Sequence, residues 1–160
     1  MAERILIIDD EDHIRRMMRL TLETAGYAVG EAGDGVTGVD LYGEGTYWDL
    51  VVLDQRMPGI DGLETLRRLK ERNPTVRVVM ATAYASIELA VDAMKLGAAD
   101  FVRKPMTPDT FRNAVAAALA KPEPIRSVSS VAPIETVTMN GFSILDPGEE
   151  NWQLPEQRRF

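Results

Sequence analysis

Polar residues stand at the end of apolar runs at four places in this sequence. The aspartate pair Asp9 and Asp10 follows the run ILII, and Asp54 follows LVVL. Thr82 ends the run VVMAT, and Lys104 closes the segment FVRK. Runs of aliphatic and β-branched residues are typical of buried parallel strands. Because the carboxyl ends of such strands meet along one edge of an open α/β sheet, we expect three carboxylates, a hydroxyl and an ammonium to share one pocket.

The expected pocket has the chemistry of a phosphoacceptor. Three unpaired carboxylates repel one another, which would raise at least one pKa unless a cation lies among them. Magnesium suits carboxylate and phosphate oxygens, and the chain has no cysteine and a single histidine to attract a softer metal. A carboxylate beside that ion, with Lys104 and Thr82 opposite, can accept a phosphoryl group as an aspartyl phosphate. The ion and the ammonium would offset the charge on the transferring oxygens.

Length and composition predict one domain with a tail. The chain has 160 residues, 45% of them hydrophobic, which is enough for one core. Its net charge of −7 argues against direct binding of nucleic acid or anionic lipid by this segment. The first residues do not have the pattern of a signal peptide, and no stretch approaches the roughly 18 apolar residues of a membrane span. We therefore expect a cytoplasmic protein that does not bind membranes.

Strand and helix patterns alternate over most of the chain. Apolar runs predict strands over 4–9, 27–32, 48–54, 75–82 and 100–104. Helical spacing and helix-end signals predict helices over 10–26, 33–45, 62–73, 85–98 and 107–121. Crossovers between parallel strands are almost always right-handed, so five strand and helix pairs predict an α/β fold, a doubly wound five-stranded parallel sheet with helices on both faces.

The pattern changes after Lys121. Three prolines and three serines fall within residues 121–133, which is typical of a linker. The predicted organisation is therefore a domain over 1–121, a linker over 122–133, and a tail or the start of an output region over 134–160.

The tail contains a hairpin pattern. Strand-forming residues on both sides of Asn140 and Gly141 predict a short β-hairpin over 135–145. Two isolated strands are marginal in water, so we expect the hairpin and Trp152 to dock on the domain or on a second copy of the chain, with homodimerisation as one outcome. The alternative is a disordered tail.

The spaced motifs together resemble a known family. They are the Asp9–Asp10 pair, the segment DQRMPGIDG that begins at Asp54, Thr82 at a strand end, and Lys104 directly before Pro105. Over about residues 4–120 the chain resembles the receiver domain of two-component response regulators. The resemblance implies a flavodoxin-like (βα)5 fold with strand order 2-1-3-4-5. It also implies that the domain takes a phosphoryl group from a histidine kinase or phosphotransfer protein and then switches a partner-binding surface.

Carried over residue by residue, the resemblance implies a magnesium site. Asp54 matches the phosphorylated aspartate, and Asp10 matches a direct ligand of the ion. Asp9 would hold the ion largely through water, and the backbone carbonyl of Arg56 would complete the protein ligands. Magnesium is thus the implied cofactor.

The resemblance also implies a switch. Thr82 matches the hydroxyl that turns toward the phosphoryl group, Lys104 matches its ion-pair partner, and Phe101 matches an aromatic switch residue that is tyrosine in many relatives. Phenylalanine keeps the ring and lacks the hydroxyl. Arg56 and Tyr84, two positions after Asp54 and Thr82, are expected to flank the route by which water reaches the acyl phosphate.

Two alternative functions fit this sequence less well. The implied domain is a signalling module that catalyses only its own phosphorylation and dephosphorylation, and is not an enzyme with an external substrate. An aspartyl-phosphate hydrolase would need a second carboxylate two positions after the nucleophile, where this chain has Arg56. A receiver-like scaffold that works without phosphorylation would not need the full acidic set with Thr82 and Lys104.

Overall fold

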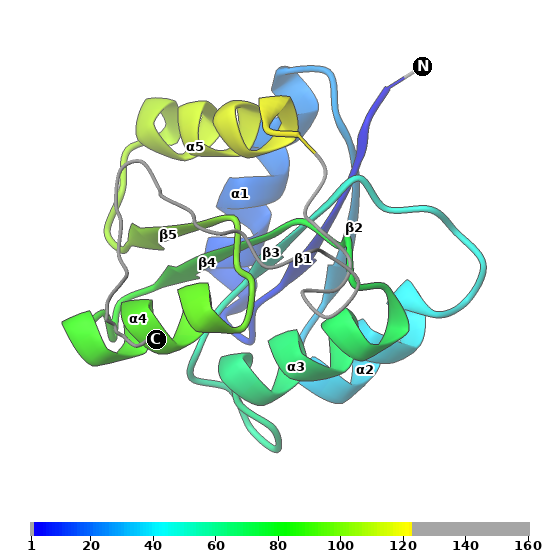
Figure 1. The fold of residues 1–160 in the computed structure, drawn as a ribbon. Helices are drawn as coiled ribbons and strands as arrows, with labels where there is room; N and C mark the ends of the chain where they lie inside the picture. The colour runs from blue at the N-terminus through cyan, green and yellow to red at the C-terminus, as the bar shows by residue number, and fades with distance from the viewer. Residues whose placement is uncertain (1, 123–160) are drawn as a thin grey trace. The chain divides into compact units, whose positions relative to one another are not determined.

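The computed structural model describes residues 2–122 of the chain, which form a parallel sheet with helices on both faces (Figure 1). The strands are β1 (Arg4–Ile8), β2 (Ala28–Ala32), β3 (Leu50–Leu53), β4 (Val78–Thr82) and β5 (Asp100–Arg103). The helices are α1 (Asp12–Thr24), α2 (Gly35–Tyr42), α3 (Gly62–Arg72), α4 (Ile87–Lys95) and α5 (Pro108–Ala120). The strand order is β2-β1-β3-β4-β5, and each neighbouring pair is parallel. The predicted fold class and strand order are confirmed.

The three central strands are almost entirely apolar, and helices cover both of their faces. Every residue of β3 and β4 is buried, as are Ile5 to Ile8 of β1. The edge strands β2 and β5 are only partly buried. Full burial of an aliphatic side chain contributes about 1.5–3 kcal/mol, so the central strands fix the register of the sheet.

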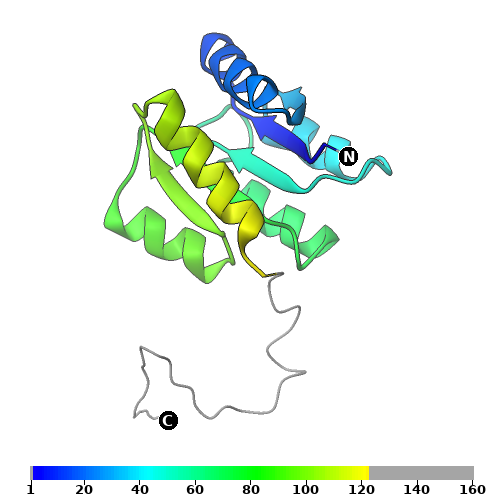
Figure 2. The same cartoon turned by 90° about the horizontal axis from the view of Figure 1, so that it is seen from above.

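The helices divide between the two faces of the sheet (Figure 2). Met18 and Leu22 of α1 join Phe111 and Val115 of α5 in a core cluster on one face. On the other face, α2, α3 and α4 contribute to a second cluster. Residue Ala93 is the one fully buried residue of α4, whereas α3 buries four. Helix α4 therefore buries fewer residues than α2 or α3, the other helices on its face.

Four of the helices begin with a side-chain cap. Asp34, Asp61, Ser86 and Thr107 each accept a hydrogen bond from a backbone N–H three residues later, at the starts of α2, α3, α4 and α5. Helix α1 begins after Glu11 without such a cap. The carboxylates of the turn that precedes α1, residues Asp9 to Glu11, are therefore not used to cap the helix.

Several predictions for the C-terminal part lie outside the described residues. They concern the linker beyond residue 122, the hairpin over 135–145 and its docking. The domain boundary at residue 121 stays a prediction. Among the helices of residues 2–122, none has the length and apolar character needed to cross a membrane.

Candidate functional site

The sheet places the predicted site residues at its carboxyl edge. Asp9 directly follows β1, Asp54 follows β3, Thr82 ends β4 and Lys104 follows β5. The backbone ladder continues to these residues, because the Asp54 N–H donates to the Ile8 carbonyl (3.0 Å) and the Lys104 N–H to the Thr82 carbonyl (2.9 Å). The register of the buried strands thus brings these side chains together, as the sequence predicted.

The Lys104 ammonium lies among three carboxylates. Its Nζ is 2.5 Å from Asp9 Oδ2, 3.5 Å from Asp54 Oδ2 and 3.5 Å from Glu11 Oε1. Lys104, Asp9 and Asp54 are 7%, 1% and 4% exposed. Buried charges require partners, and here one cation is shared by several anions. The site therefore keeps an excess of negative charge away from bulk water.

Burial and the neighbouring charges shift the pKa values of Asp54 and Lys104. Burial raises the pKa of Asp54, and the neighbouring Asp9 charge adds to this effect, although the Lys104 ammonium works in the opposite direction. Burial alone would lower the pKa of Lys104, but the hydrogen bond to Asp9 and the three carboxylate charges raise it. Lys104 consequently stays charged, and additional positive charge near Asp54 would favour its ionised form.

An oxygen-only cluster lies at the same place. Carboxylate oxygens of Asp9, Glu11 and Asp54 lie within 4.8 Å of one another. Hard cations such as Mg²⁺ and Ca²⁺ take oxygen ligands of this kind. Asp10, the ligand implied by the resemblance, is exposed and is not part of this cluster.

Glu11 is the site residue that the sequence reasoning missed. Its backbone N–H donates to Asp9 Oδ1 (2.9 Å), which folds the acidic turn back on itself. The signal that could have identified it is the unbroken acidic run DDED at residues 9–12.

The two predicted switch residues lie on neighbouring strands, Thr82 at the end of β4 and Phe101 in β5. Thr82 is fully buried, and its Oγ1 accepts a hydrogen bond from the Tyr84 N–H (3.1 Å). Phe101 is half-buried and packs against the core cluster that includes Ala93 of α4.

The Arg56 guanidinium lies 4.1 Å from the centre of the Tyr84 ring, a cation–π contact between two exposed side chains. Arg56 and Tyr84 therefore touch each other across the loops that follow β3 and β4.

A model of the response regulator receiver domain matches residues 5–116. The chain belongs to this family. The site just described is thus the carboxyl edge of a receiver domain of the two-component response regulators, and a receiver domain is a signalling module. The resemblance inferred from the motifs is confirmed.

Three curated relatives illustrate the similarity. The chain is 38% identical to the regulatory protein AtoC of Escherichia coli over 116 residues, which cover 72% of this chain and 25% of AtoC. It is 35% identical to the transcriptional regulatory protein FixJ of Bradyrhizobium diazoefficiens over 128 residues, covering 80% and 62%. It is 36% identical to sporulation initiation phosphotransferase F of Bacillus subtilis over 115 residues, covering 72% and 92%. The matched segment is therefore only a part of the first two relatives.

Solved receiver structures have the same fold. A CheY-like receiver domain protein from Methanospirillum hungatei superposes with a TM-score of 0.70 at 29% identity, covering 74% of this chain and 94% of that one. A CheX–CheY–BeF3–Mg complex from Borrelia burgdorferi gives a TM-score of 0.71 at 27% identity, covering 74% and 90%.

The raised pKa of Asp54 predicts that Asp54→Asn stabilises the protein at pH 7 when no divalent cation is present. The folded state holds the Asp54 proton more tightly than the unfolded chain does. This contribution to stability is fully present below about pH 4, the usual pKa of aspartate, and is lost as pH rises through the folded pKa. A neutral amide avoids that loss, so we expect a gain of about 1 kcal/mol at pH 7 that shrinks toward pH 4. Urea unfolding followed by circular dichroism measures both values.

Asp40→Asn is the matched control, because it makes the same substitution on an exposed position of α2. It should change the free energy of unfolding by less than about 0.5 kcal/mol at either pH. Equal gains in the two variants would contradict the assigned role of burial at Asp54.

Proposed function

We propose that Asp54 is the phosphoacceptor of this receiver domain and that a histidine kinase or a phosphotransfer protein is the donor. The observation that carries the proposal is the buried Asp54 carboxylate, which lies 3.5 Å from the Lys104 ammonium and within the Asp9 and Glu11 carboxylate cluster. A carboxylate is a competent nucleophile toward phosphorus when the surrounding charge is offset.

The chain's own residues have defined tasks in the transfer. An Asp54 oxygen forms the new bond to phosphorus while the bond from phosphorus to the donor nitrogen or oxygen breaks, and the leaving group departs with that electron pair. Lys104 is already held at the site by Asp9, so its ammonium can pair with a phosphoryl oxygen without reorganisation. The Thr82 hydroxyl at the end of β4 would donate to another oxygen of the group.

The oxygen ligands fit Mg²⁺ as the cofactor. Asp10, Asp54 and the carbonyl of Arg56 would bind the ion, and Asp9 would hold it largely through water. Glu11 is an additional candidate because its carboxylate lies in the cluster. When bound, the ion supplies positive charge that neutralises the phosphoryl oxygens and the surplus carboxylates.

The burial of Asp54 together with Lys104 favours this function over the alternatives. Position 56 holds an arginine, so it supplies no second carboxylate for an external hydrolase reaction. The Arg56 side chain is exposed and lies over the Tyr84 ring. The phosphorylation and dephosphorylation of Asp54 are the only reactions we assign, and the domain catalyses both on itself. A scaffold without phosphorylation would have no need to bury Asp54 and Lys104 together, a costly arrangement.

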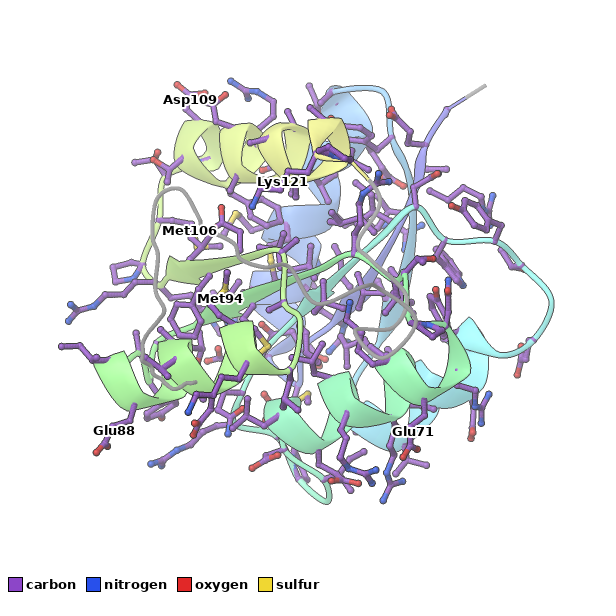
Figure 3. All side chains as sticks on the ribbon, viewed as in Figure 1. Glu71, Glu88, Met94, Met106, Asp109 and Lys121 are labelled. Atoms are coloured by element: carbon purple, nitrogen blue, oxygen red, sulfur yellow. The ribbon has the colours of Figure 1, made fainter. Side chains whose placement is uncertain are left out.

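We also propose that the surface formed by α4, β5 and α5 is the part that switches. Thr82 and Phe101 lie at its inner edge, and α4 exposes the apolar side chains Ile87 (84%), Val91 (44%) and Met94 (50%). Figure 3 shows Glu88 of α4 and Asp109 of α5 projecting outward at its two ends. A phosphoryl group of about −1.5 to −2 charge on Asp54 would draw the Thr82 hydroxyl inward and leave room for the Phe101 ring to follow.

The remaining proposals concern the whole protein. Homodimerisation, a cytoplasmic location and the absence of direct nucleic-acid binding by this segment stay predictions.

We expect acetyl phosphate to label Asp54 only when Mg²⁺ is present, because the ion screens the approaching anion from the Asp9 and Glu11 carboxylates. Intact mass and peptide mapping should show one phosphoryl group per chain. Asp54→Asn should remain unlabelled, and Asp40→Asn should be labelled like the wild type. Labelling of the Asp54→Asn variant on another residue, or equal labelling in chelator, would refute the assignment.

The contact between Arg56 and Tyr84 should slow the approach of water to the acyl phosphate. We therefore predict that the phosphorylated form lasts longer in the wild type than in variants that lack this contact. Exposed cation–π contacts contribute about 0.5–1 kcal/mol, so opening the pair should speed hydrolysis roughly two- to fivefold. Because each side chain holds the other, Arg56→Ala, Tyr84→Ala and the double variant should have similar half-lives when the loss of label is followed in Mg²⁺. Tyr47→Ala, which removes another exposed tyrosine, is the control; half-lives equal to its own in all three variants would make the pair a bystander.

The proposed switch predicts where the structure responds to a phosphate mimic. With beryllofluoride and Mg²⁺, amide shift changes beyond the pocket should cluster on α4, β5 and α5, because the charge at Asp54 acts through Thr82 and Phe101. Asp54→Asn treated in the same way should show none of these changes. Changes confined to α1 would exclude this surface as the one that switches.

A further inference from the structure

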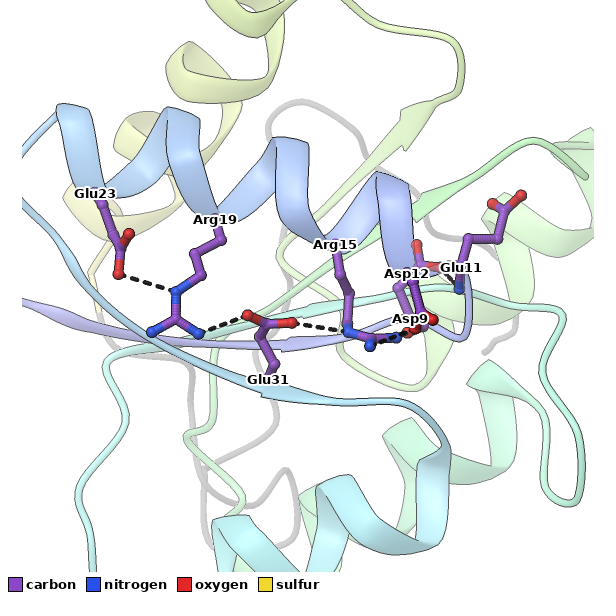
Figure 4. A network of polar contacts seen from close by, with 7 residues as sticks. All are labelled: Asp9, Glu11, Asp12, Arg15, Arg19, Glu23 and Glu31. Carbon is purple, nitrogen blue, oxygen red and sulfur yellow. Dashed lines mark hydrogen bonds and ion pairs between the residues drawn. The ribbon is translucent and has the colours of Figure 1, made fainter.

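A polar network joins α1 to the edge strand β2 (Figure 4). The Glu31 carboxylate of β2 bridges two arginines of α1, with Oε1 3.0 Å from Arg15 Nε and Oε2 2.5 Å from Arg19 Nη1. Arg15 Nη2 also donates to Asp12 Oδ1 (2.7 Å), and Arg19 Nε donates to Glu23 Oε2 (3.0 Å). Glu31 thus fixes both guanidinium groups against the edge of the sheet.

Only one of the two arginines reaches the acidic turn. Arg15 Nη1 donates to the backbone carbonyl of Asp9 at 2.5 Å, and the Arg15 side chain is 16% exposed. Arg19 lies one turn further along α1 and is 40% exposed, and within residues 2–122 it pairs with Glu23 and Glu31 alone. Arg19 therefore has the contacts of an ordinary surface ion pair, whereas Arg15 has an additional contact at the pocket.

The hydrogen bond from Arg15 is one of several that hold Asp9 in place. The Asp9 N–H donates to the Ala32 carbonyl of β2 (3.1 Å), so the backbone of Asp9 is held on both sides. Its carboxylate accepts from the Glu11 N–H (2.9 Å) and from Lys104 Nζ (2.5 Å). The backbone of Asp9 sets where this carboxylate and the following turn lie relative to Asp54.

We infer that Arg15 is a positioning residue of the cation site, which holds the turn Asp9 to Glu11 through the Asp9 carbonyl, and that Glu31 holds Arg15 in place. The inference rests on the proposed function, because the turn positioned is the one that would bind Mg²⁺. It makes β2, the strand at the opposite edge of the sheet from β5, a part of the site. A planar guanidinium suits this role because it donates in three directions at once, to Glu31, Asp12 and the carbonyl.

The direction in which Arg15→Gln changes the affinity for Mg²⁺ distinguishes a positioning role from a purely electrostatic one. A guanidinium near the acidic turn repels a divalent cation, so Arg15→Gln would tighten Mg²⁺ binding if Arg15 acted through charge alone. If Arg15 positions the turn, the same substitution weakens binding. Outer contacts of this kind typically change metal affinity by about 10–100-fold.

The experiment is a titration of the full ¹⁵N-labelled chain with MgCl₂, followed by amide shifts, for the wild type, Arg15→Gln and Arg19→Gln. We expect the Kd for Mg²⁺ to rise about tenfold or more in Arg15→Gln and to stay within about twofold in Arg19→Gln. Both variants remove one arginine from Glu31, so their thermal midpoints without Mg²⁺ report the ion-pair loss they share. At saturating Mg²⁺, labelling of Arg15→Gln by acetyl phosphate should return to near the wild-type rate, because Arg15 does not touch Asp54.

The outcomes separate the two claims. Wild-type protein that shows no Mg²⁺-dependent shifts refutes the proposed function and this inference with it. Wild-type protein that binds Mg²⁺, together with an Arg15→Gln variant that binds equally or more tightly, overturns the inference alone. If Arg15→Gln does not fold, Arg15→Lys serves instead. It keeps the charge without the planar fork, and a wild-type Kd in that variant overturns the inference as well.

Discussion

The chemistry of this domain depends on the ion pairs that the buried Lys104 ammonium makes with Asp9, Glu11 and Asp54. Removing a cation from such a cluster would leave buried anions without a partner, which is strongly unfavourable. The parallel register of β1, β3, β4 and β5 brings these groups together at one edge of the sheet. One cation does not balance three anions, so the pocket favours further positive charge. The pKa of Asp54 is raised chiefly because the carboxyl group is buried, and the neighbouring Asp9 charge adds to this effect.

The two faces of the sheet have different depths of packing. Helices α1 and α5 share one core cluster through large buried side chains, including Met18, Leu22 and Phe111. On the other face, α4 buries little more than Ala93 and exposes an apolar side. Regions with few buried contacts have the lowest cost of local rearrangement. Phe101 packs against the cluster that contains Ala93, and Thr82 ends the strand that precedes α4. The phosphorylation that we propose for Asp54 would therefore act where the fold resists rearrangement least.

The sequence predicted the features that depend on strand ends. Central strands are unbroken apolar runs, so their ends could be located, and the positions of Asp9, Asp54, Thr82 and Lys104 followed from them. Strand order came from resemblance, because periodicity does not reveal which strands are neighbours. The roles of Glu11 and Arg15 were missed since each depends on side-chain contacts across a turn or between α1 and β2. Glu31 lies in a weakly patterned strand, so no sequence periodicity indicated its two arginine partners.

The two aspartates of the acidic pair differ in burial. Asp9 is 1% exposed, and both of its carboxylate oxygens already accept hydrogen bonds, from the Glu11 N–H and from Lys104. A carboxylate has about four lone-pair positions, so Asp9 retains only part of its capacity for a cation. Asp10 is exposed and lies outside the cluster of Asp9, Glu11 and Asp54. The limited free capacity of Asp9 fits the role that the resemblance implies for it, a fixed anchor that acts largely through water, while the direct binding by Asp10 stays a proposal.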